Sequence, residues 1–551
     1  MLRPTTLTAM PTTRLALILA AAVLSSGCGN SGPPGGPAGE RIPASAEDVF
    51  IDSPVPDNAS GAPTTAIAAT VYLPERAAGE TVPLILHSHG WGGDRVTEAD
   101  TQGEFDTSGF YSVAIDSQVG RFWQDGYAVI SFDERGFHDS GGAIRVMDPE
   151  FETRDAIAVL DWAEANLPLA RSADGNPLVG AIGGSYGGGF QLLLAAFDDR
   201  LDAITPSATW YHLPDSLAPN GVIKKLWDFG LCFSAVAAGD RTFSDDLTLA
   251  CQQAGFDPSI RFTEELDPAI LAFLGAHGMG AMQARHEDPA DPFTMRPIDT
   301  LLTQGQRDLL FPLNDALANY RFLSSLGGDV RLITHQHGHY IGPPLDAQAP
   351  LGAMACGELD TLEAKHAWFA EKLKGETGAA AAIPPVCIGL DDDRGIALAT
   401  VPRAASAARV TLPDTLVSAD QNNYGGNPPT FVPLSAPVSG NGSVLAGMPV
   451  ANLTVTPVVP TAQVVAFVGI GVQSVGDSAP RLLDDQVTVL RNGEHLDFEL
   501  TGIGEALADG DTLGVLLYGD HDAFNTAAHN NWLANNYRIS GSVDLPIVTA
   551  P

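Results

Sequence analysis

The fold of this chain is decided by one stretch, Leu178-Val179-Gly180-Ala181-Ile182-Gly183-Gly184-Ser185-Tyr186-Gly187-Gly188-Gly189-Phe190-Gln191-Leu192-Leu193-Leu194. An apolar run ends at the serine, and a helical apolar pattern begins directly after it. A serine between such a strand and such a helix is typical of a nucleophile elbow, a sharp turn that lifts the hydroxyl clear of a sheet. Side chains would collide across so sharp a turn, which explains the flanking glycines. Ser185 is therefore the candidate nucleophile, although a chain with 58 glycines can contain such a pentapeptide by chance.

Strand and helix patterns alternate on both sides of this turn. Strands are predicted at 82–87, 127–132, 201–205, 298–303 and 330–334, and helices at 152–167, 314–326 and 361–373. Such alternation indicates right-handed crossovers and a mostly parallel sheet. Between residues 210 and 296 the alternation stops and helical patterns remain. We interpret this segment as a cap inserted above the sheet, where it shapes a substrate pocket.

Two further residues follow predicted strands in the order that acyl transfer requires. Asp308 comes just after the strand that follows the cap, and His339 just after the next strand. The order Ser185, Asp308, His339 is that of the α/β-hydrolase fold, in which the aspartate orients the histidine and the histidine activates the serine. Asp308 has an alternative role as an acid at a helix N-terminus. His335 and His337 compete with His339, which itself has alternatives as a metal-binding or surface histidine.

The developing oxyanion of acyl transfer needs main-chain donors beside the nucleophile. The amide of Tyr186 directly follows Ser185, so the elbow geometry makes it one donor. The second donor is expected in the loop after the 82–87 strand, where we choose the amide of Trp91. The alternative is that His89-Gly90 forms only a tight turn.

A change of texture after residues 379–385 marks a second region. Short alternating strands are predicted at 445–460, 464–471, 486–491 and 512–518, separated by Gly, Pro, Asn and Asp. This pattern predicts an all-β sandwich or jelly roll. The predicted organisation is a signal segment (1–28), a flexible tether (29–44), an α/β-hydrolase domain (45–380, with its cap at about 210–296) and a β-sandwich domain (386–551).

The formal net charge of −37 excludes some classes of partner. Nucleic acid and anionic membrane surfaces would repel so acidic a chain. No Cys-x-x-Cys pair or His/Cys cluster has metal-binding spacing, so a metal site such as a zinc site is not expected. The expected partner is a small-molecule or peptide substrate.

The first 28 residues have the pattern of an export signal. Arg14 precedes an apolar run of about ten residues, whereas a membrane-spanning helix needs about 20. The small residues before Cys28 resemble a bacterial lipobox, although Leu24 is one position further from the cysteine than usual. We expect a lipoprotein anchored through Cys28 in the periplasm or at the cell surface, with contact to membrane only through this anchor. Ordinary signal cleavage and secretion is the alternative.

Four cysteines remain if Cys28 carries lipid, and an even number outside the cytoplasm suggests disulfides. Three pairings are possible. We predict Cys232–Cys251 and Cys356–Cys387, because one pair lies within the inserted segment and the other flanks one helix. Both loops then close without crossing the sheet.

Several motifs together resemble the Xaa-Pro dipeptidyl-peptidase and cocaine esterase family. They are Gly-Gly-Ser-Tyr-Gly-Gly at 183–188, Asp133-x-Arg135-Gly136 followed by Ser140-x-Gly142, and the C-terminal β region. The resemblance covers about residues 45–550 and implies a cofactor-free serine hydrolase of peptides or esters. Related enzymes have an oxyanion-binding tyrosine hydroxyl in the loop where this chain has Trp91, so here we expect the main-chain amide to serve.

The leading hypothesis is an exported serine hydrolase that cleaves Xaa-Pro-type peptide bonds or ester bonds through an acyl-enzyme. A dipeptidyl-peptidase needs acidic residues in the cap to hold a substrate amino group, and Glu264, Glu265 and Asp267 are present there. A carboxylesterase or acylase of small acyl esters needs only a fitted pocket. A surface binding lipoprotein without activity is the alternative from another class. Residues 133–142 are interpreted as a structural turn that supports the site.

Overall fold

The computed structural model of the protein describes residues 41–549, with gaps. The residues outside the description are 1–40, 103–110, 225–226, 229, 234–240, 254–265, 340–353, 405–407, 419–428, 435–436, 439–441, 522, 525–534 and 550–551. The predicted signal segment with Cys28, and most of the predicted tether, therefore lie outside the described residues. The tether ends before residue 44, because β1 (Arg41–Ile42) pairs antiparallel with β4 (Arg76–Ala77).

A ten-stranded sheet, in the order β14-β13-β10-β9-β8-β7-β5-β6-β3-β2, is the centre of the first region. Its strands are β2 (Ser45–Ser53), β3 (Thr65–Leu73), β5 (Leu84–Ser88), β6 (Ala128–Phe132), β7 (Val179–Gly184), β8 (Leu201–Ser207), β9 (Asp299–Gly305), β10 (Val330–His335), β13 (Val386–Gly389) and β14 (Gly395–Leu398). Neighbouring strands from β6 through to β13 pair in parallel, and β2, β3 and β14 pair antiparallel at the edges. The mostly parallel sheet predicted from the sequence is therefore confirmed.

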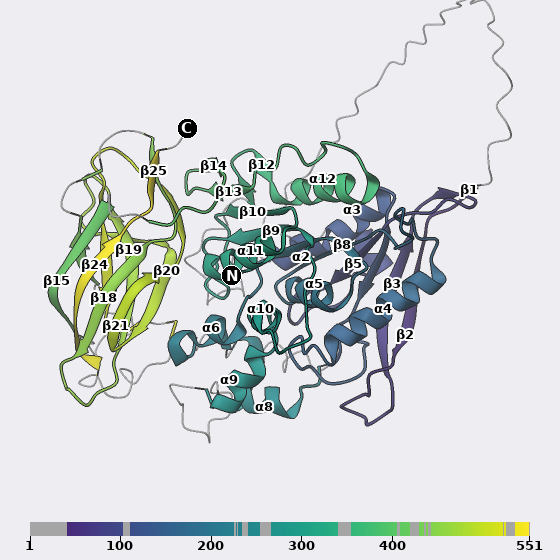
Figure 1. Ribbon diagram of the computed structural model, residues 1–551, viewed down its shortest axis with the longest axis horizontal. Coiled ribbons are helices and arrows are strands. Elements are labelled where there is room, and N and C mark those ends of the chain that lie inside the picture. The colour runs from purple at the N-terminus through teal and green to yellow at the C-terminus, as the bar shows by residue number, and fades with distance from the viewer. Residues whose placement is uncertain are drawn as a thin grey trace, which may run out of the picture. The chain divides into compact units, whose positions relative to one another are not determined.

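Helices cover both faces of this sheet (Figure 1). Helices α3 (Gln118–Gln124) and α12 (Thr361–Lys374) pack on one side, and α4 (Glu152–Asn166), α5 (Tyr186–Phe197) and α11 (Leu313–Leu326) contribute to the core on the other. The short helices α1 (Glu98–Thr101) and α2 (Tyr111–Asp116) precede α3. Because both faces are covered, every residue of β5 and β7 is buried.

The domain boundary predicted at residue 386 falls inside the sheet and is wrong. Strand β13 begins at that residue and pairs in parallel with β10, and β14 then pairs antiparallel with β13. The proline-rich residues 383–385 resemble a linker, but they lead into a strand that is buried at all four positions. Strands of the C-terminal β region begin at β15 (Arg409–Val417).

Helices alone separate β8 from β9 in the described part of the inserted segment. They are α6 (Leu213–Leu217), η1 (Pro219–Gly221), α8 (Asp245–Cys251), α9 (Pro268–Gly275) and α10 (Met279–Glu287). A disulfide joins Cys232 to Cys251 within this segment, and a second joins Cys356 to Cys387, from β11 (Ala355–Cys356) to β13. Both are the predicted pairs. Strand β11 pairs with β12 (Leu359–Asp360). Among the described helices, none is both long and apolar enough to span a bilayer.

The described part of the C-terminal region contains three antiparallel sheets, ordered β15-β24-β18-β21, β16-β23-β19-β20 and β22-β17-β25. Their further strands are β16 (Thr430–Pro433), β17 (Ser443–Gly447), β18 (Val450–Pro457), β19 (Val465–Gln473), β20 (Arg481–Arg491), β21 (Gly493–Glu499), β22 (Ile503–Ala506), β23 (Thr512–Tyr518), β24 (Tyr537–Asp544) and β25 (Ile547–Thr549). The two four-stranded sheets share one apolar core, to which Leu453 and Ile539 contribute from one sheet and Val468 and Val515 from the other.

Candidate active site

Ser185 occupies the sharp turn between β7 and α5. Its main-chain angles, φ 57° and ψ −114°, lie in a region that L-residues rarely adopt. The turn is held from below, because the Ser185 amide donates to the carbonyl oxygen of Ser207 at 2.9 Å. A strained serine in this position is what an elbow requires, since the strain presents the hydroxyl above the sheet.

Two glycines after Ser185 leave no room for a side chain. A Cβ at Gly187 would lie 2.1 Å from the carbonyl oxygen of Ser88, and one at Gly188 would lie 2.7 Å from the Cβ of Thr209. The first contact is with main chain of the neighbouring strand β5, which cannot move aside cheaply. The glycines that flank the serine in the sequence are therefore a packing requirement of the turn.

We expect Gly187→Ala to destabilise the protein and displace Ser185. Overpacking of this kind typically costs about 1–3 kcal/mol, and here main chain has to move. Thermal unfolding and covalent labelling by a fluorophosphonate measure the two effects. Gly275→Ala on α9 is the matched control, because the nearest atom to its Cβ is the side-chain Nε2 of His212 at 3.2 Å. Equal melting temperatures for the two variants would contradict the packing requirement.

The structure brings Ser185, His339 and Asp308 into one hydrogen-bonded series. Nε2 of His339 lies 3.0 Å from Oγ of Ser185, and Nδ1 lies 2.8 Å from Oδ2 of Asp308. The histidine is further packed between aromatic rings, with centroids 5.5 Å from Trp227 and 5.3 Å from Phe311. The position of the imidazole is thus fixed by contacts at both of its nitrogens and by two neighbouring aromatic rings.

Asp308 is buried, and the carboxyl oxygen that does not contact His339 also accepts hydrogen bonds. Oδ1 accepts hydrogen bonds from the amides of Leu310 and Phe311 at 2.9 and 2.8 Å. These bonds close the turn before α11. Since α11 begins only at Leu313, Asp308 is not the acid at a helix N-terminus that was the alternative role. In the structure Asp308 makes the turn-closing bonds with one oxygen while the other contacts His339.

A side chain of the C-terminal region holds the loop that carries Asp308. Nε2 of Gln486 donates to the carbonyl oxygens of Gln306 and Asp308 at 2.8 and 2.9 Å. The preceding residue of β20, Asp485, forms an ion pair with Arg307 of the same loop. The sequence offered no signal for this support, because the residues lie about 180 positions apart.

The other two histidines of the His335-Gln336-His337-Gly338-His339 run do not contact Ser185 in the structure. His335 is the last residue of β10, and its burial lowers its pKa to about 3. Nδ1 of His337 contacts the Gly338 carbonyl oxygen at 2.6 Å. Only His339 is far enough beyond the strand to lie over Ser185.

A buried lysine lies beneath the elbow. Nζ of Lys365, on α12, donates to the carbonyl oxygen of Thr205 at 3.0 Å and to Oγ of Ser207 at 2.7 Å. Burial lowers the pKa of Lys365 to about 7. Because Ser207 accepts the amide hydrogen of Ser185, this lysine supports the strand on which the turn rests. Nothing in the sequence distinguishes this lysine, since a lysine in an amphipathic helix normally faces solvent.

Tyr186 and Trp91, whose main-chain amides are the predicted oxyanion donors, both lie beside Ser185. None of the described residues accepts a hydrogen bond from the main-chain amide of Tyr186 or of Trp91. The side chains are engaged elsewhere: the Tyr186 hydroxyl accepts from the Met147 amide at 3.2 Å, and the Trp91 indole donates to the Leu231 carbonyl oxygen at 3.0 Å. Their rings pack edge to face, with centroids 5.3 Å apart.

Residues 133–142 form an ion-paired turn behind this site. Asp133 accepts from the Arg95 amide and guanidinium, and Arg135 makes two hydrogen bonds to Asp155 at 2.7 and 2.9 Å. Gly142, with φ +84°, lies against the Arg135 side chain, where a Cβ would be 2.7 Å away. These contacts agree with the structural role expected for the motif.

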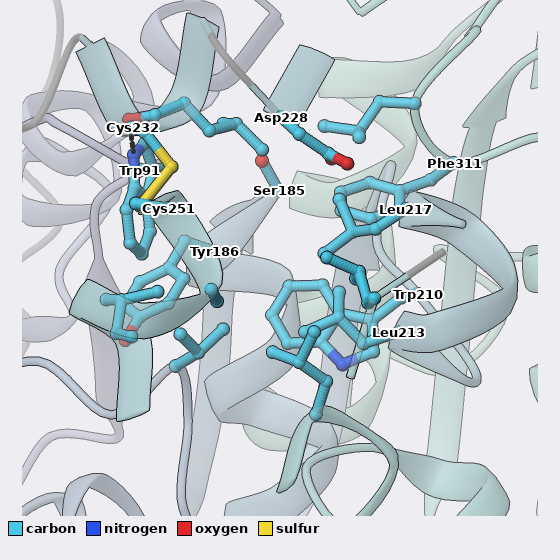
Figure 2. A pocket seen from close by; sticks show the side chains of 17 residues that line it. Trp91, Ser185, Tyr186, Trp210, Leu213, Leu217, Asp228, Cys232, Cys251 and Phe311 are labelled. Carbon is cyan, nitrogen blue, oxygen red and sulfur yellow. Dashed lines mark hydrogen bonds between the residues drawn. A yellow bond between two sulfur atoms is a disulfide. The ribbon is translucent and has the colours of Figure 1, made fainter. Parts of the chain in front are cut away.

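A pocket opens beside Ser185 and is shown in Figure 2. Seventeen residues line it; most of them are aliphatic or aromatic, and eleven belong to the inserted segment. Both cysteines of the Cys232–Cys251 disulfide are among them. One lining residue that the sequence analysis did not select is Asp228. In the sequence, Asp228 is distinguished only by being an acidic residue within an otherwise apolar run from Leu226 to Leu231.

Comparison with known proteins gives a match to a protein family. The family model described as X-Pro dipeptidyl-peptidase (S15 family) matches residues 61–341, just over half of the chain. The match contains the elbow, Asp308 and His339.

Curated relatives match over a shorter stretch. An uncharacterized 31.7 kDa protein in the traX-finO intergenic region of Escherichia coli is 32% identical over 138 residues, which are 25% of this chain and 40% of that protein. The quorum-quenching protein AidA of Acinetobacter baumannii is 30% identical over 139 residues, which are 25% of this chain and 39% of that protein. The chain thus spans about two fifths of the length of these relatives.

Solved structures are similar over nearly the whole chain. An aminopeptidase from a marine sediment archaeon, Thaumarchaeota archaeon, has a TM-score of 0.59 at 13% identity and covers 91% of this chain and 97% of its own. A CocE/NonD family hydrolase from Staphylococcus aureus has a TM-score of 0.59 at 13% identity, over 92% of this chain and 97% of its own. At such low identity these likenesses show the fold, which is that of the α/β-hydrolases with an additional β region.

Proposed function

Because the chain belongs to the X-Pro dipeptidyl-peptidase (S15) family, we propose that it is an exported serine hydrolase that cleaves Xaa-Pro-type peptide bonds or ester bonds. The single observation that carries the proposal is the hydrogen-bonded series Ser185–His339–Asp308 at the elbow. Nucleophile, base and orienting acid need this mutual geometry for acyl transfer.

In the proposed reaction the hydroxyl of Ser185 attacks the carbonyl carbon of the substrate while its proton passes to Nε2 of His339. Asp308 accepts the Nδ1 hydrogen, which fixes the imidazole tautomer and stabilises the imidazolium. The leaving alcohol or amine takes the proton from His339, and an acyl-enzyme remains. Water then attacks the acyl group by the same route and releases the acid.

The main-chain amides of Tyr186 and Trp91 bind the oxyanion in this proposal. Support comes from their positions around Ser185 and from the lack of a hydrogen-bond acceptor for either amide in the described part of the chain. A donor of this kind typically contributes about 10²–10³ in rate. The Trp91 indole is held by Leu231, which leaves the main chain as the donor from this loop.

Peptidase and esterase activity remain the two candidate functions, and the cap supplies the observation that bears on them. Of the three cap acids that a dipeptidyl-peptidase would draw on, Glu264 and Glu265 lie outside the described residues. Asp267 accepts the Ala269 amide at the start of α9. An apolar pocket beside Ser185 favours the carboxylesterase alternative.

The experiment that tests the function is a substrate profile of the purified protein. Xaa-Pro p-nitroanilides are compared with short-chain p-nitrophenyl esters, and a fluorophosphonate probe reports the reactive serine. Hydrolysis of either class with labelling supports the proposal. Absence of both hydrolysis and labelling in folded protein would leave the surface binding lipoprotein as the better hypothesis.

We also predict that Cys28 becomes the lipidated N-terminus of the mature protein. Mass spectrometry of membrane-extracted protein is expected to find a diacylglycerol-modified Cys28 as the first residue. Cys28→Ser should release the protein from the membrane fraction without changing its activity. A soluble mature form that begins at another residue would instead mean simple secretion.

For the C-terminal region we propose a jelly roll. Support comes from two four-stranded antiparallel sheets that share one apolar core. A crystal structure that traces the connections between these strands tests this topology.

A further inference from the structure

Apart from Ser185 itself, the pocket has one strongly polar position in a largely apolar lining. Among the described residues that line it, Asp228 is the only one with a charged group, and Trp91, Trp210 and Phe311 are typical of the others. Figure 2 shows the Asp228 carboxyl group and the Ser185 hydroxyl both directed into the cavity. An acyl group bound in this pocket is therefore enclosed by a lining that includes both groups.

Asp228 has no partner within the described protein. Its exposed fraction is 7%, and none of the described residues donates a hydrogen bond to either carboxyl oxygen. The charged group that bears on it is Lys224, in the same segment. Nζ of Lys224, however, donates to the carbonyl oxygens of Leu309 and Leu310 at 2.8 and 3.0 Å.

An ionised carboxylate without a hydrogen-bond donor is very costly in such a site, so the group is expected to take up a proton. Burial raises the pKa of Asp228 well above its usual range, in agreement with this argument. Burial also lowers the pKa of Lys224 to about 8 and raises that of Tyr186 well above its usual range. Lys224 keeps its charge below its pKa, but it does not line the pocket, and its Nζ is hydrogen bonded to main-chain carbonyl oxygens and not to Asp228.

We propose that Asp228 is an uncharged carboxylic acid that donates its hydrogen to an acceptor oxygen on the acyl group of the substrate. The pocket then selects uncharged, largely apolar acyl groups that carry one such oxygen. A carboxylic acid kept neutral by an apolar site is an effective donor, because no water competes for its hydrogen. This inference rests on the proposed function and narrows it, since a substrate with a free ammonium group would require the carboxylate form.

The proposal has a defined dependence on pH. Below its raised pKa Asp228 is neutral and can donate. As the pH rises through that pKa the group ionises, its hydrogen is lost, and the preference for oxygen-bearing acyl groups disappears. In Asp228→Asn the amide donates at every pH, so the preference persists at high pH.

Three esters of matched shape test the proposal on the full chain. They are p-nitrophenyl 3-methoxypropanoate, in which an ether oxygen replaces a methylene of p-nitrophenyl pentanoate, the pentanoate itself, and the cationic p-nitrophenyl 3-(methylamino)propanoate. After correction for their intrinsic rates of alkaline hydrolysis, the wild type should favour the methoxy ester about 3–10-fold in kcat/KM over the pentanoate, as one neutral hydrogen bond allows. Asp228→Leu should remove this preference, and Asp228→Asn should keep it.

Two results would overturn the inference. One is a preference for the cationic ester that Asp228→Asn abolishes, which would make Asp228 a carboxylate that holds an ammonium group. The other is equal use of the methoxy and pentanoyl esters by the wild type. Fluorophosphonate labelling separates this failure from that of the proposed function, because a folded wild type that is neither labelled nor active refutes the hydrolase itself. If Asp228→Leu fails to fold, the wild-type and Asp228→Asn pH profiles still decide.

Discussion

Ser185→Ala is expected to lower kcat by about 10⁶ and to abolish fluorophosphonate labelling. The alanine removes the only atom that forms the proposed acyl-enzyme bond, while the turn that carries it is retained. The decrease in kcat is measured with the ester or p-nitroanilide that the wild type hydrolyses best, and circular dichroism checks that the variant is folded. Ser325→Ala is the matched control, because Ser325 is an exposed serine on α11. A folded Ser185→Ala protein with unchanged turnover would refute the assignment.

His339→Gln is expected to cost nearly as much as the loss of Ser185, because members of a triad act as a unit. Glutamine can retain hydrogen bonds to neighbours but cannot accept and return a proton at neutral pH. The distances of 3.0 Å to Ser185 and 2.8 Å to Asp308 make His339 the histidine in position for this transfer.

His337→Gln is the comparison variant for this prediction. His337 precedes the proposed base by two residues, and its Nδ1 contacts the carbonyl oxygen of Gly338. Its replacement should therefore leave most of the activity. The two variants are compared by kcat/KM on one substrate. Loss in His337→Gln with activity retained in His339→Gln would make His337 the base.

The elbow could be predicted from the sequence because its physics is local. The glycines around Ser185 leave almost no other arrangement between a buried strand and a helix, and the contact at Gly187 shows why. Asp308 and His339 could be placed because each follows a predicted strand, and the ends of parallel strands meet at one edge of a sheet. The structure puts both within hydrogen-bond distance of their expected partners.

The features that the sequence did not reveal depend on distant segments. Val386 begins a strand of the large sheet although prolines precede it, because β10 offers it an edge to pair with. Lys365 is buried only because Thr205 and Ser207 supply acceptors. Asp228 gains its significance from the pocket around it, and no spacing rule identifies a single acid of that kind.

The contact between Gln486 and the Asp308 loop affects the order in which parts of the molecule fold during synthesis. Asp308 accepts this hydrogen bond from a residue 178 positions further along the chain, so its loop is complete only after most of the β region has been synthesised. Chains fold largely from the N-terminus as they emerge, and contacts this distant in sequence form late. The elbow can thus form early on a growing chain, while the loop that orients the base waits for the C-terminal strands. A nascent or truncated chain would therefore carry its nucleophile before it carries a finished catalytic apparatus.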